Sequence, residues 1–191
     1  MGLPAEKLYT LDEYVALEVA TGIKHEYDQG RVTAMAGGTP QHAMMAANVI
    51  GSLRDDLKGK PCKPVGSDLK LGIGDRFFYA DVAVLCPPVK RAPELPDAII
   101  NPRVVFEVLS DSTEAYDRGE KFALYRQNEE LIEYILISPT RVYAEHYTRA
   151  GTGSETWNLA FLGPESILHL TSIDCEVSLA SLYEGMEMLA A

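Results

Sequence analysis

The chain has 191 residues, of which 47% are apolar and 24% are charged, a composition typical of a globular protein, and its length predicts one domain over residues 1–191. No uncharged apolar run reaches the roughly eighteen residues that a membrane-spanning helix needs, and the N-terminus lacks the basic and apolar segments of a signal peptide. The formal net charge is −11, which argues against nucleic-acid binding unless cations offset it.

The cysteines point to a reducing environment. Cys62, Cys86 and Cys175 are odd in number and widely spaced, so we expect neither a disulfide framework nor a CxxC metal site. Cys86 is expected to be a free thiol that packs at the edge of a loop. This usage is typical of a cytoplasmic protein.

The first quarter of the chain predicts a helix, a hairpin and a second helix. A Thr-x-x-Glu capping box at residues 10–13 predicts a helix over 11–21. Two short strands are expected on either side of the turn at residues 28–30. Apolar residues at helical spacing predict a second helix over about 41–58.

The rest of the chain is richer in strands. Several apolar runs have the β-branched composition of buried central strands. In chain order we expect strands at 69–73, 77–85 and 104–109, a long loop at 87–102, a helix at 117–128, a strand at 133–137, an edge strand at 141–148, and a short strand with a closing helix within 168–189. Helices before and between strands indicate an α/β fold with helices packed on a sheet.

Two acidic residues interrupt the apolar runs. Asp81 lies within the run at 77–85, and Glu107 lies within the run at 104–109. Burying an unpaired carboxylate costs several kcal/mol, and a bound cation removes that cost. If the two strands are neighbours, both acids can bind one ion, and carboxylates with a backbone carbonyl suit Mg²⁺ or Mn²⁺ better than Zn²⁺. The alternative is that each acid pairs with an arginine or lies at an exposed strand end.

A lysine follows at helical spacing from a further acid. Asp117, Lys121 and Tyr125 share one face of the predicted helix. Beside a carboxylate site, Lys121 could hold a water molecule or a phosphate oxygen and stabilise developing charge. The alternative is an exposed Asp117–Lys121 ion pair of little energetic value.

Other motifs give weaker signals. The four histidines lack the spacing of a zinc site, and His42, near a helix start, is expected to cap or pack rather than to face a cleft. The glycines at 37–38 belong to no phosphate-binding motif, and Ser110 is not in a G-x-S-x-G elbow.

An ordered set of elements carries a family resemblance. The set comprises Glu-Tyr-Asp-Gln-Gly-Arg-Val at 26–32, His42 with Asn48 and Leu53, Tyr-Ala-Asp-Val at 79–82, Val-Phe-Glu-Val-Leu-Ser at 105–110, Asp117 with Lys121 and Tyr125, and Glu-Tyr-Ile-Leu-Ile at 133–137. Together they resemble the Uma2 family of restriction-endonuclease-like proteins, a branch of the PD-(D/E)XK nuclease superfamily. The resemblance covers roughly residues 7 to 185.

The resemblance implies a fold and a set of site residues. The fold is a restriction-endonuclease-like mixed β-sheet of four or five strands flanked by helices, with the active site at one sheet edge. Asp81 and Glu107 match the family's metal ligands, with the carbonyl of Val108, and Glu26 matches its early acid. Leu109 stands where the superfamily's E-x-K lysine is expected, and the resemblance assigns that role to Lys121. Lys70, on the preceding strand, is a second candidate.

The sequence therefore predicts a Mg²⁺- or Mn²⁺-dependent endonuclease that hydrolyses nucleic acid, with DNA as the expected substrate. One alternative is a catalytically degenerate nuclease fold that serves as a binding or scaffold protein, which the missing E-x-K lysine and the acidic charge favour. Another is a small-molecule phosphohydrolase that uses the same acids. No membrane partner is expected, and a homodimer would extend the binding surface by two-fold symmetry.

Overall fold

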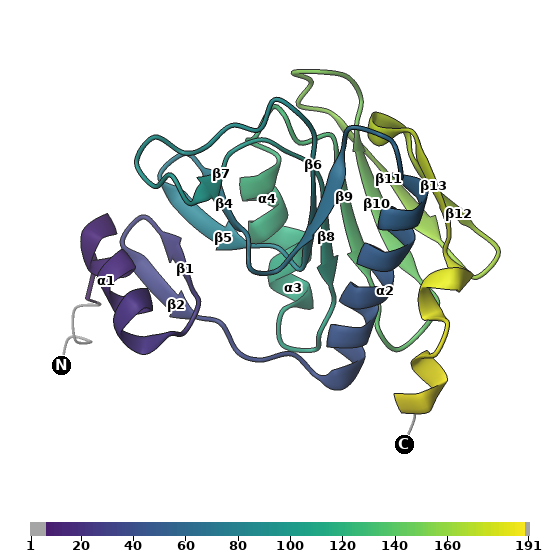
Figure 1. Ribbon diagram of the computed structural model, residues 1–191, viewed down its shortest axis with the longest axis horizontal. Coiled ribbons are helices and arrows are strands. Elements are labelled where there is room, and N and C mark those ends of the chain that lie inside the picture. The colour runs from purple at the N-terminus through teal and green to yellow at the C-terminus, as the bar shows by residue number, and fades with distance from the viewer. Residues whose placement is uncertain (1–6, 190–191) are drawn as a thin grey trace.

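A computed structural model describes residues 7–189, and Figure 1 shows how the elements are arranged. In this part of the chain the largest sheet has six strands, not the four or five that the resemblance implied. In spatial order they are β11 (Trp157–Leu162), β10 (Ala144–Arg149), β9 (Glu133–Ile137), β8 (Pro102–Val108), β6 (Val82–Leu85) and β3 (Lys63–Gly66). Strands β8 and β9 run parallel and the other neighbours run antiparallel, so the sheet is mixed, as predicted.

A second sheet lies beside the first and carries the N-terminal helix. In spatial order its strands are β2 (Arg31–Ala34), β1 (His25–Asp28), β5 (Arg76–Tyr79), β4 (Lys70–Ile73) and β7 (Ala98–Ile99). Helix α1 (Leu11–Thr21) packs against this sheet through the buried Tyr14. In Figure 1, α1, β1 and β2 form one end of the molecule, and a linker leads from β2 to the helix that follows.

Both faces of the six-stranded sheet are covered. Helix α2 (Pro40–Asp56) packs on one face, together with the hairpin of β12 (Ile167–Leu170) and β13 (Cys175–Ser178). The opposite face packs against α4 (Phe122–Tyr125). Alternate residues along the sheet strands belong to the two cores, as the pleat of a strand buried on both faces requires.

Several predicted elements are confirmed with small shifts at their ends. The helix over 11–21 begins at the capping box, where the Thr10 side chain accepts the Glu13 N–H and Glu13 accepts the Thr10 N–H. The hairpin of β1 and β2 turns at Gln29 and Gly30, both of which have positive φ. Helix α2 and strand β9 also occur where they were expected.

The single strand expected over residues 77–85 is wrong. The run contains two strands in different sheets, because β5 pairs with β1 and β4 whereas β6 pairs with β3 and β8. Ala80 and Asp81 connect the two sheets. Both halves of the run are buried, so hydrophobicity alone gives no sign of the break.

Three other predictions need correction. The helix expected over 117–128 begins earlier, with α3 (Glu114–Tyr116), continues as a π-helical segment, η1 (Asp117–Lys121), and ends with α4. The strand expected over 141–148 is not at the edge, because β11 lies outside β10. Instead of a closing helix, the tail has the β12–β13 hairpin and 3₁₀ segments. These are η2 (Thr171–Ile173), η3 (Ala180–Tyr183) and η4 (Met186–Leu189).

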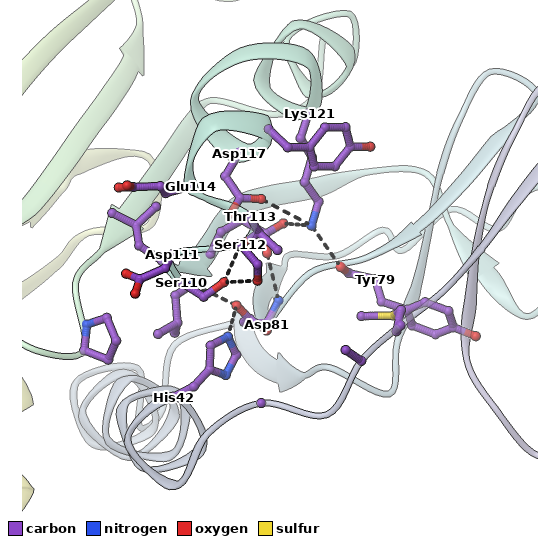
Figure 2. Close-up of a pocket in the computed structure, with 18 of the residues that line it drawn as sticks. His42, Tyr79, Asp81, Ser110, Asp111, Ser112, Thr113, Glu114, Asp117 and Lys121 are labelled. Carbon is purple, nitrogen blue, oxygen red and sulfur yellow. Dashed lines mark hydrogen bonds and ion pairs between the residues drawn. The ribbon is translucent and has the colours of Figure 1, made fainter.

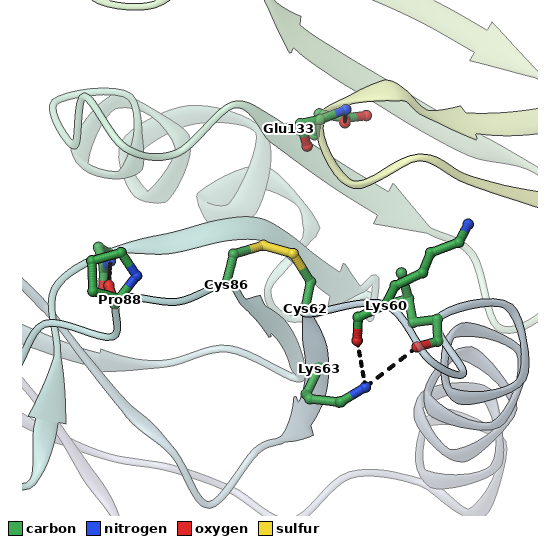
Figure 3. The surroundings of a disulfide bond; sticks show 9 residues. Lys60, Cys62, Lys63, Cys86, Pro88 and Glu133 are labelled. Atoms are coloured by element: carbon green, nitrogen blue, oxygen red, sulfur yellow. Dashed lines mark hydrogen bonds between the residues drawn. A yellow bond between two sulfur atoms is a disulfide. The ribbon is translucent and has the colours of Figure 1, made fainter.

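The expectation about cysteine is also wrong, because Cys62 and Cys86 form a disulfide (Figure 3). The β3–β6 register pairs Lys63 with Leu85, so the two cysteines lie directly beyond the paired ends, with Cα atoms 4.2 Å apart. Cys175 is a buried free thiol. The disulfide removes one of the observations on which the cytoplasmic expectation rested. Within residues 7–189, no helix has the length and apolar character needed to cross a bilayer.

We expect the disulfide to stabilise the native state by about 3 kcal/mol, since it closes a loop of 24 residues in the unfolded chain. Urea unfolding with and without a reductant measures this contribution. The Cys62→Ala/Cys86→Ala double variant is the matched control, and the reductant should not change its midpoint. Equal midpoints for the parent protein with and without reductant would show that the bond contributes nothing.

Candidate active site

Asp81 lies where the chain passes from the second sheet to the first, and β8 fixes its side chain. Its Oδ2 accepts the Val108 N–H at 2.7 Å, and its own N–H donates to Glu107 Oε2 at 3.4 Å. The condition for a shared site, that the two acid-bearing segments are neighbours, is met, because β6 directly after Asp81 pairs with β8 in a register that places Val82 opposite Phe106. The two acids lie near the ends of the inner strands β6 and β8.

Glu107 is a buried carboxyl group, and the Lys121 charge beside it does not fully offset the effect of burial on its pKa. Its side chain is 4% exposed, and its Oε1 lies 2.9 Å from Lys121 Nζ. This contact is an ion pair without hydrogen-bond geometry, since Oε1 has no hydrogen-bond partner among the described residues. Burial raises the pKa of Glu107 to about 8; the Lys121 charge opposes the rise, and repulsion from Asp81 and Asp117 adds to it.

Lys121 brings three carboxylates together. Its Nζ lies 2.9 Å from Glu107, 3.5 Å from Glu26 and 3.9 Å from Asp117, and it donates to the Tyr79 carbonyl at 3.4 Å. Burial alone would lower the pKa of Lys121, but the charges of Glu107 and Glu26 raise it well above its ordinary value. The alternative of an exposed Asp117–Lys121 pair is wrong, because both side chains are buried.

Glu26 and Asp117 share this lysine instead of having cations of their own. Burial raises the pKa of each carboxyl group, and the Lys121 charge opposes the rise in both. Glu26 comes from β1 in the second sheet, and Asp117 comes from the π-helical segment. The site therefore gathers carboxylates from separate elements around a single ammonium group.

His42 also contacts the site, although the sequence favoured a capping or packing role. Thr39 caps α2 by accepting the His42 N–H, and the imidazole Nε2 lies 3.1 Å from Asp81 Oδ2 (Figure 2). The hydrogen bond to Asp81 raises the pKa of His42. A Cβ at Gly38 would come within 2.9 Å of the imidazole, so the glycine at position 38 was the signal that could have indicated this placement.

Lys70, the second candidate for the lysine role, is not part of this cluster. Its Nζ donates to Glu18 Oε2 at 2.5 Å and lies over the Tyr14 ring. It is not among the residues that line the cavity at the site. Lys70 thus joins α1 to the second sheet.

The cavity is large and acidic. Its volume is about 1090 Å³, and it contains eight carboxylate residues against four lysines and arginines. The acidic residues are Glu26, Asp28, Asp81, Glu107, Asp111, Glu114, Asp117 and Glu120, and the basic ones are Arg31, Arg118, Lys121 and Arg141. Six other basic residues do not line the cavity, although Arg76 pairs with the lining Asp28; they are Lys58, Lys60, Lys63, Arg76, Lys90 and Arg91.

The donor set suits a hard divalent cation. Among residues 7–189 no three or more His, Cys, Asp or Glu side chains form a group that could hold a metal ion. The candidate ligands are two carboxylates and a backbone carbonyl, and Glu107 Oε1 already lies 2.9 Å from Lys121 Nζ. These are oxygen donors of the type that Mg²⁺ prefers, and its charge would offset the excess of carboxylates.

Comparisons with known proteins show which family the chain is similar to. The sequence profile of the Uma2 family, described as "Putative restriction endonuclease", matches residues 11–180. Two proteins of Synechocystis sp. (strain ATCC 27184 / PCC 6803 / Kazusa) are similar along most of their length. "Uncharacterized protein slr1290" is 36% identical, and the match covers 92% of this chain and 91% of that protein. "Uncharacterized protein sll1609" is 31% identical, and the match covers 79% of this chain and 86% of that protein.

A solved structure shares the fold. The crystal structure of a protein from Anabaena variabilis ATCC 29413, described as "a putative nuclease belonging to DUF820", superposes with a TM-score of 0.75. The match covers 93% of this chain and 99% of that one at 16% sequence identity. The two proteins therefore share the mixed α/β fold.

The raised pKa of Glu107 should give the metal-free protein a pH-dependent stability. The unfolded value is near 4.5 and the folded value is about 8, so between them the native state keeps a proton that the unfolded chain releases. Stability should then fall as pH rises through this window, by up to about 1.4 kcal/mol per pH unit. We expect Glu107→Gln to remove most of that slope.

Urea denaturation across this pH range in the presence of EDTA measures the slope. Glu94→Gln is the matched control, because Glu94 is exposed and lies outside the cavity. An unchanged slope in Glu107→Gln would show that Glu107 is ionised in the native protein throughout the window.

Proposed function

The chain belongs to the Uma2 family, and from this membership and the site geometry we propose that it is a metal-dependent nuclease that hydrolyses phosphodiester bonds of nucleic acid, with DNA as the expected substrate. One observation carries the proposal. Asp81, directly before β6, and Glu107 of the adjacent β8 are joined by the Asp81 N–H and Val108 N–H bonds, at a cavity lined by eight carboxylate residues and four lysines and arginines.

The proposed ligands of Mg²⁺ or Mn²⁺ are the carboxylates of Asp81 and Glu107 and the carbonyl of Val108. When bound, a divalent cation would lower the pKa of water, orient it toward the scissile phosphate and neutralise charge on the leaving oxygen. The Val108 N–H keeps Asp81 in place by a 2.7 Å hydrogen bond. Residues 107–108 of β8 would therefore supply two of the ligands and also orient the third, Asp81.

The neighbouring side chains have supporting roles in this proposal. His42 holds Asp81 through Oδ2, which leaves the other carboxylate oxygen for a ligand. Lys121 would hold a phosphate oxygen or the attacking water. It would take the role of the E-x-K lysine, whose position is occupied by Leu109 in this chain. Glu26 and Asp117 keep the Lys121 ammonium charged and positioned.

The charges of the cavity predict how such a substrate is held. Arg118 is already paired with Glu114 and Glu145, and Lys121 is paired with the buried acids. Phosphate groups would therefore be held mainly through the metal and by few side chains. Each phosphate contact adds about 0.9 to the slope of log affinity against log salt, so this slope should be shallow.

A second candidate is a small-molecule phosphohydrolase that uses the same acids. The acidic cavity and the absence of a basic track among the described residues that line it favour a compact substrate over a long duplex. A catalytically degenerate scaffold is the third, since the Glu107–Lys121 pair forms without a metal. Comparing free nucleotides with plasmid DNA separates the first two candidates, and metal titration separates both from the third.

We expect Asp81→Asn and Glu107→Gln each to abolish Mg²⁺- or Mn²⁺-dependent cleavage, with a loss of at least about 100-fold, because each removes a charge that the cation needs. Lys121→Met should reduce the rate while leaving metal binding largely intact. Single-turnover assays on plasmid and oligonucleotide substrates measure this, with circular dichroism as a check on folding. Glu94→Gln is the matched control outside the cavity and should cleave normally. Undiminished cleavage by both acid variants would refute the assignment.

Calorimetric titration with Mn²⁺ tests the metal site without reference to activity. The parent protein and Glu94→Gln should bind the ion, and Asp81→Asn and Glu107→Gln should bind at least about tenfold more weakly, because each loses one charged oxygen ligand. Binding that is absent from the parent protein at millimolar Mn²⁺ would favour the scaffold alternative.

A further inference from the structure

Strand β11 forms one edge of the six-stranded sheet, and its outer side is unpaired among the described residues. Strand β10 pairs with the inner side of β11 along its whole length, from Ala144 opposite Leu162 to Arg149 opposite Trp157. Two large apolar side chains on it are exposed, Leu159 at 43% and Phe161 at 66%. Edges of this kind are open to pairing with another strand.

The hydrogen-bond pattern shows which residues face outward. The Ala150 N–H donates to the Thr156 carbonyl at 2.9 Å, which makes this a hydrogen-bonded pair next to the end of the ladder. Such pairs recur every second residue in an antiparallel ladder, so the even-numbered residues of β11 bond to β10. Trp157, Leu159 and Phe161 therefore direct their N–H and C=O groups to the free edge.

We propose that β11 pairs antiparallel with β11 of a second copy of this chain, about a two-fold axis at Leu159. In this register Leu159 lies opposite its own counterpart, and Trp157 lies opposite Phe161 of the second copy. All three outward-facing residues of each strand then form hydrogen-bonded pairs, and their side chains share one face of the sheet. The resulting contacts are apolar on both sides of the axis.

Charge favours a second copy of this chain as the occupant. The chain carries −11, so most of its surface repels another copy, but residues 156–164 contain no charged side chain. Glu145 and Arg149 of β10, which flank this strip, are buried and already bonded, to Arg118 and to backbone carbonyls respectively. The strip also lacks the lysines and bulges with which proteins protect exposed edges.

The interface would lie close to the candidate active site. Phe161 stacks on Tyr143 with ring centroids 6.5 Å apart, and Arg141 lies over the Tyr143 ring and lines the cavity. The proposed dimer joins the six-stranded sheets of the two copies into one continuous sheet, and in each copy the interface residue Phe161 is linked through Tyr143 to Arg141 at the cavity. The proposal rests on the free edge of β11 and does not depend on nuclease activity.

A cysteine scan tests both pairing and register. Only residue 159 meets its own counterpart in the proposed register, and Cα atoms of a hydrogen-bonded pair, about 5.5 Å apart, are within disulfide range. We expect Leu159→Cys to form a cross-linked dimer on mild oxidation at least about tenfold faster than Asn158→Cys, Ala160→Cys or the parent chain, because pairing raises the local thiol concentration. Preferential cross-linking of either neighbouring variant, or equal rates in all four proteins, would overturn the register.

The oligomeric state of uncross-linked protein tests the pairing itself. Sedimentation velocity should give a dimer for the parent chain and a monomer for Leu159→Pro, because proline removes only an outward N–H and leaves the bonds to β10 intact. Leu159→Glu should also be monomeric, and Val19→Glu, which places the same charge on an exposed position of α1, should remain a dimer. A monomeric parent chain, or a dimer that survives Leu159→Pro with native circular dichroism, would refute the proposal.

Discussion

A single buried ammonium group shared by several carboxylates determines the architecture around the cavity. Lys121 Nζ lies within 4 Å of Glu107, Glu26 and Asp117, which come from three different elements. One positive charge serves three carboxyl groups, of which Glu107 and Asp117 are buried and Glu26 is partly buried, and burial raises the pKa of all three acids. Removing the lysine would leave buried carboxyl groups without a cation. Through these contacts Lys121 links both sheets to the helical segment that carries it.

The π-helical turn at Asp117–Lys121 follows from the same constraint. The turn lies between α3 and α4, and it brings an acid and a lysine into the cavity from one short segment. Tyr134 of β9 donates to the Asp117 carbonyl at 3.1 Å, which ties the turn to the sheet below it. Single π-helical turns within helices frequently lie at functional sites, because they redirect side chains that a regular α-helix would place elsewhere.

The sequence predicted the acids of the site better than their surroundings. Asp81 and Glu107 stood out because a charge inside an apolar strand needs a physical reason. His42 did not, because a histidine in the first turn of a helix fits a packing role equally well, and its contact with Asp81 depends on how α2 lies against β6 and β8. The position of a helix on a sheet is a tertiary property that local spacing does not encode.

The errors in the fold have the same origin. The Cys62–Cys86 bond depends on the pairing of β3 with β6, and nothing in a Lys-Pro-Val-Gly segment predicts that pairing. The break at Ala80 and Asp81 depends on two sheets with different partners. Both features arise from contacts between residues that are distant in sequence, whereas the confirmed helix at Leu11–Thr21 depends on a local capping box.

The net charge of −11 first counted against nucleic acid, and the structure shows where part of it lies. Eight carboxylate residues line the cavity, and few basic residues offset them: Arg76 pairs with Asp28 from outside the lining, whereas Lys90 pairs with Glu130, which is not a lining residue. An acidic cavity repels a phosphate and attracts a cation. Under the proposed function, a cation bound at Asp81 and Glu107 would reduce the repulsion between this cavity and a polyanionic substrate, so the charge that disfavours nucleic acid is the same charge that would make its hydrolysis depend on metal.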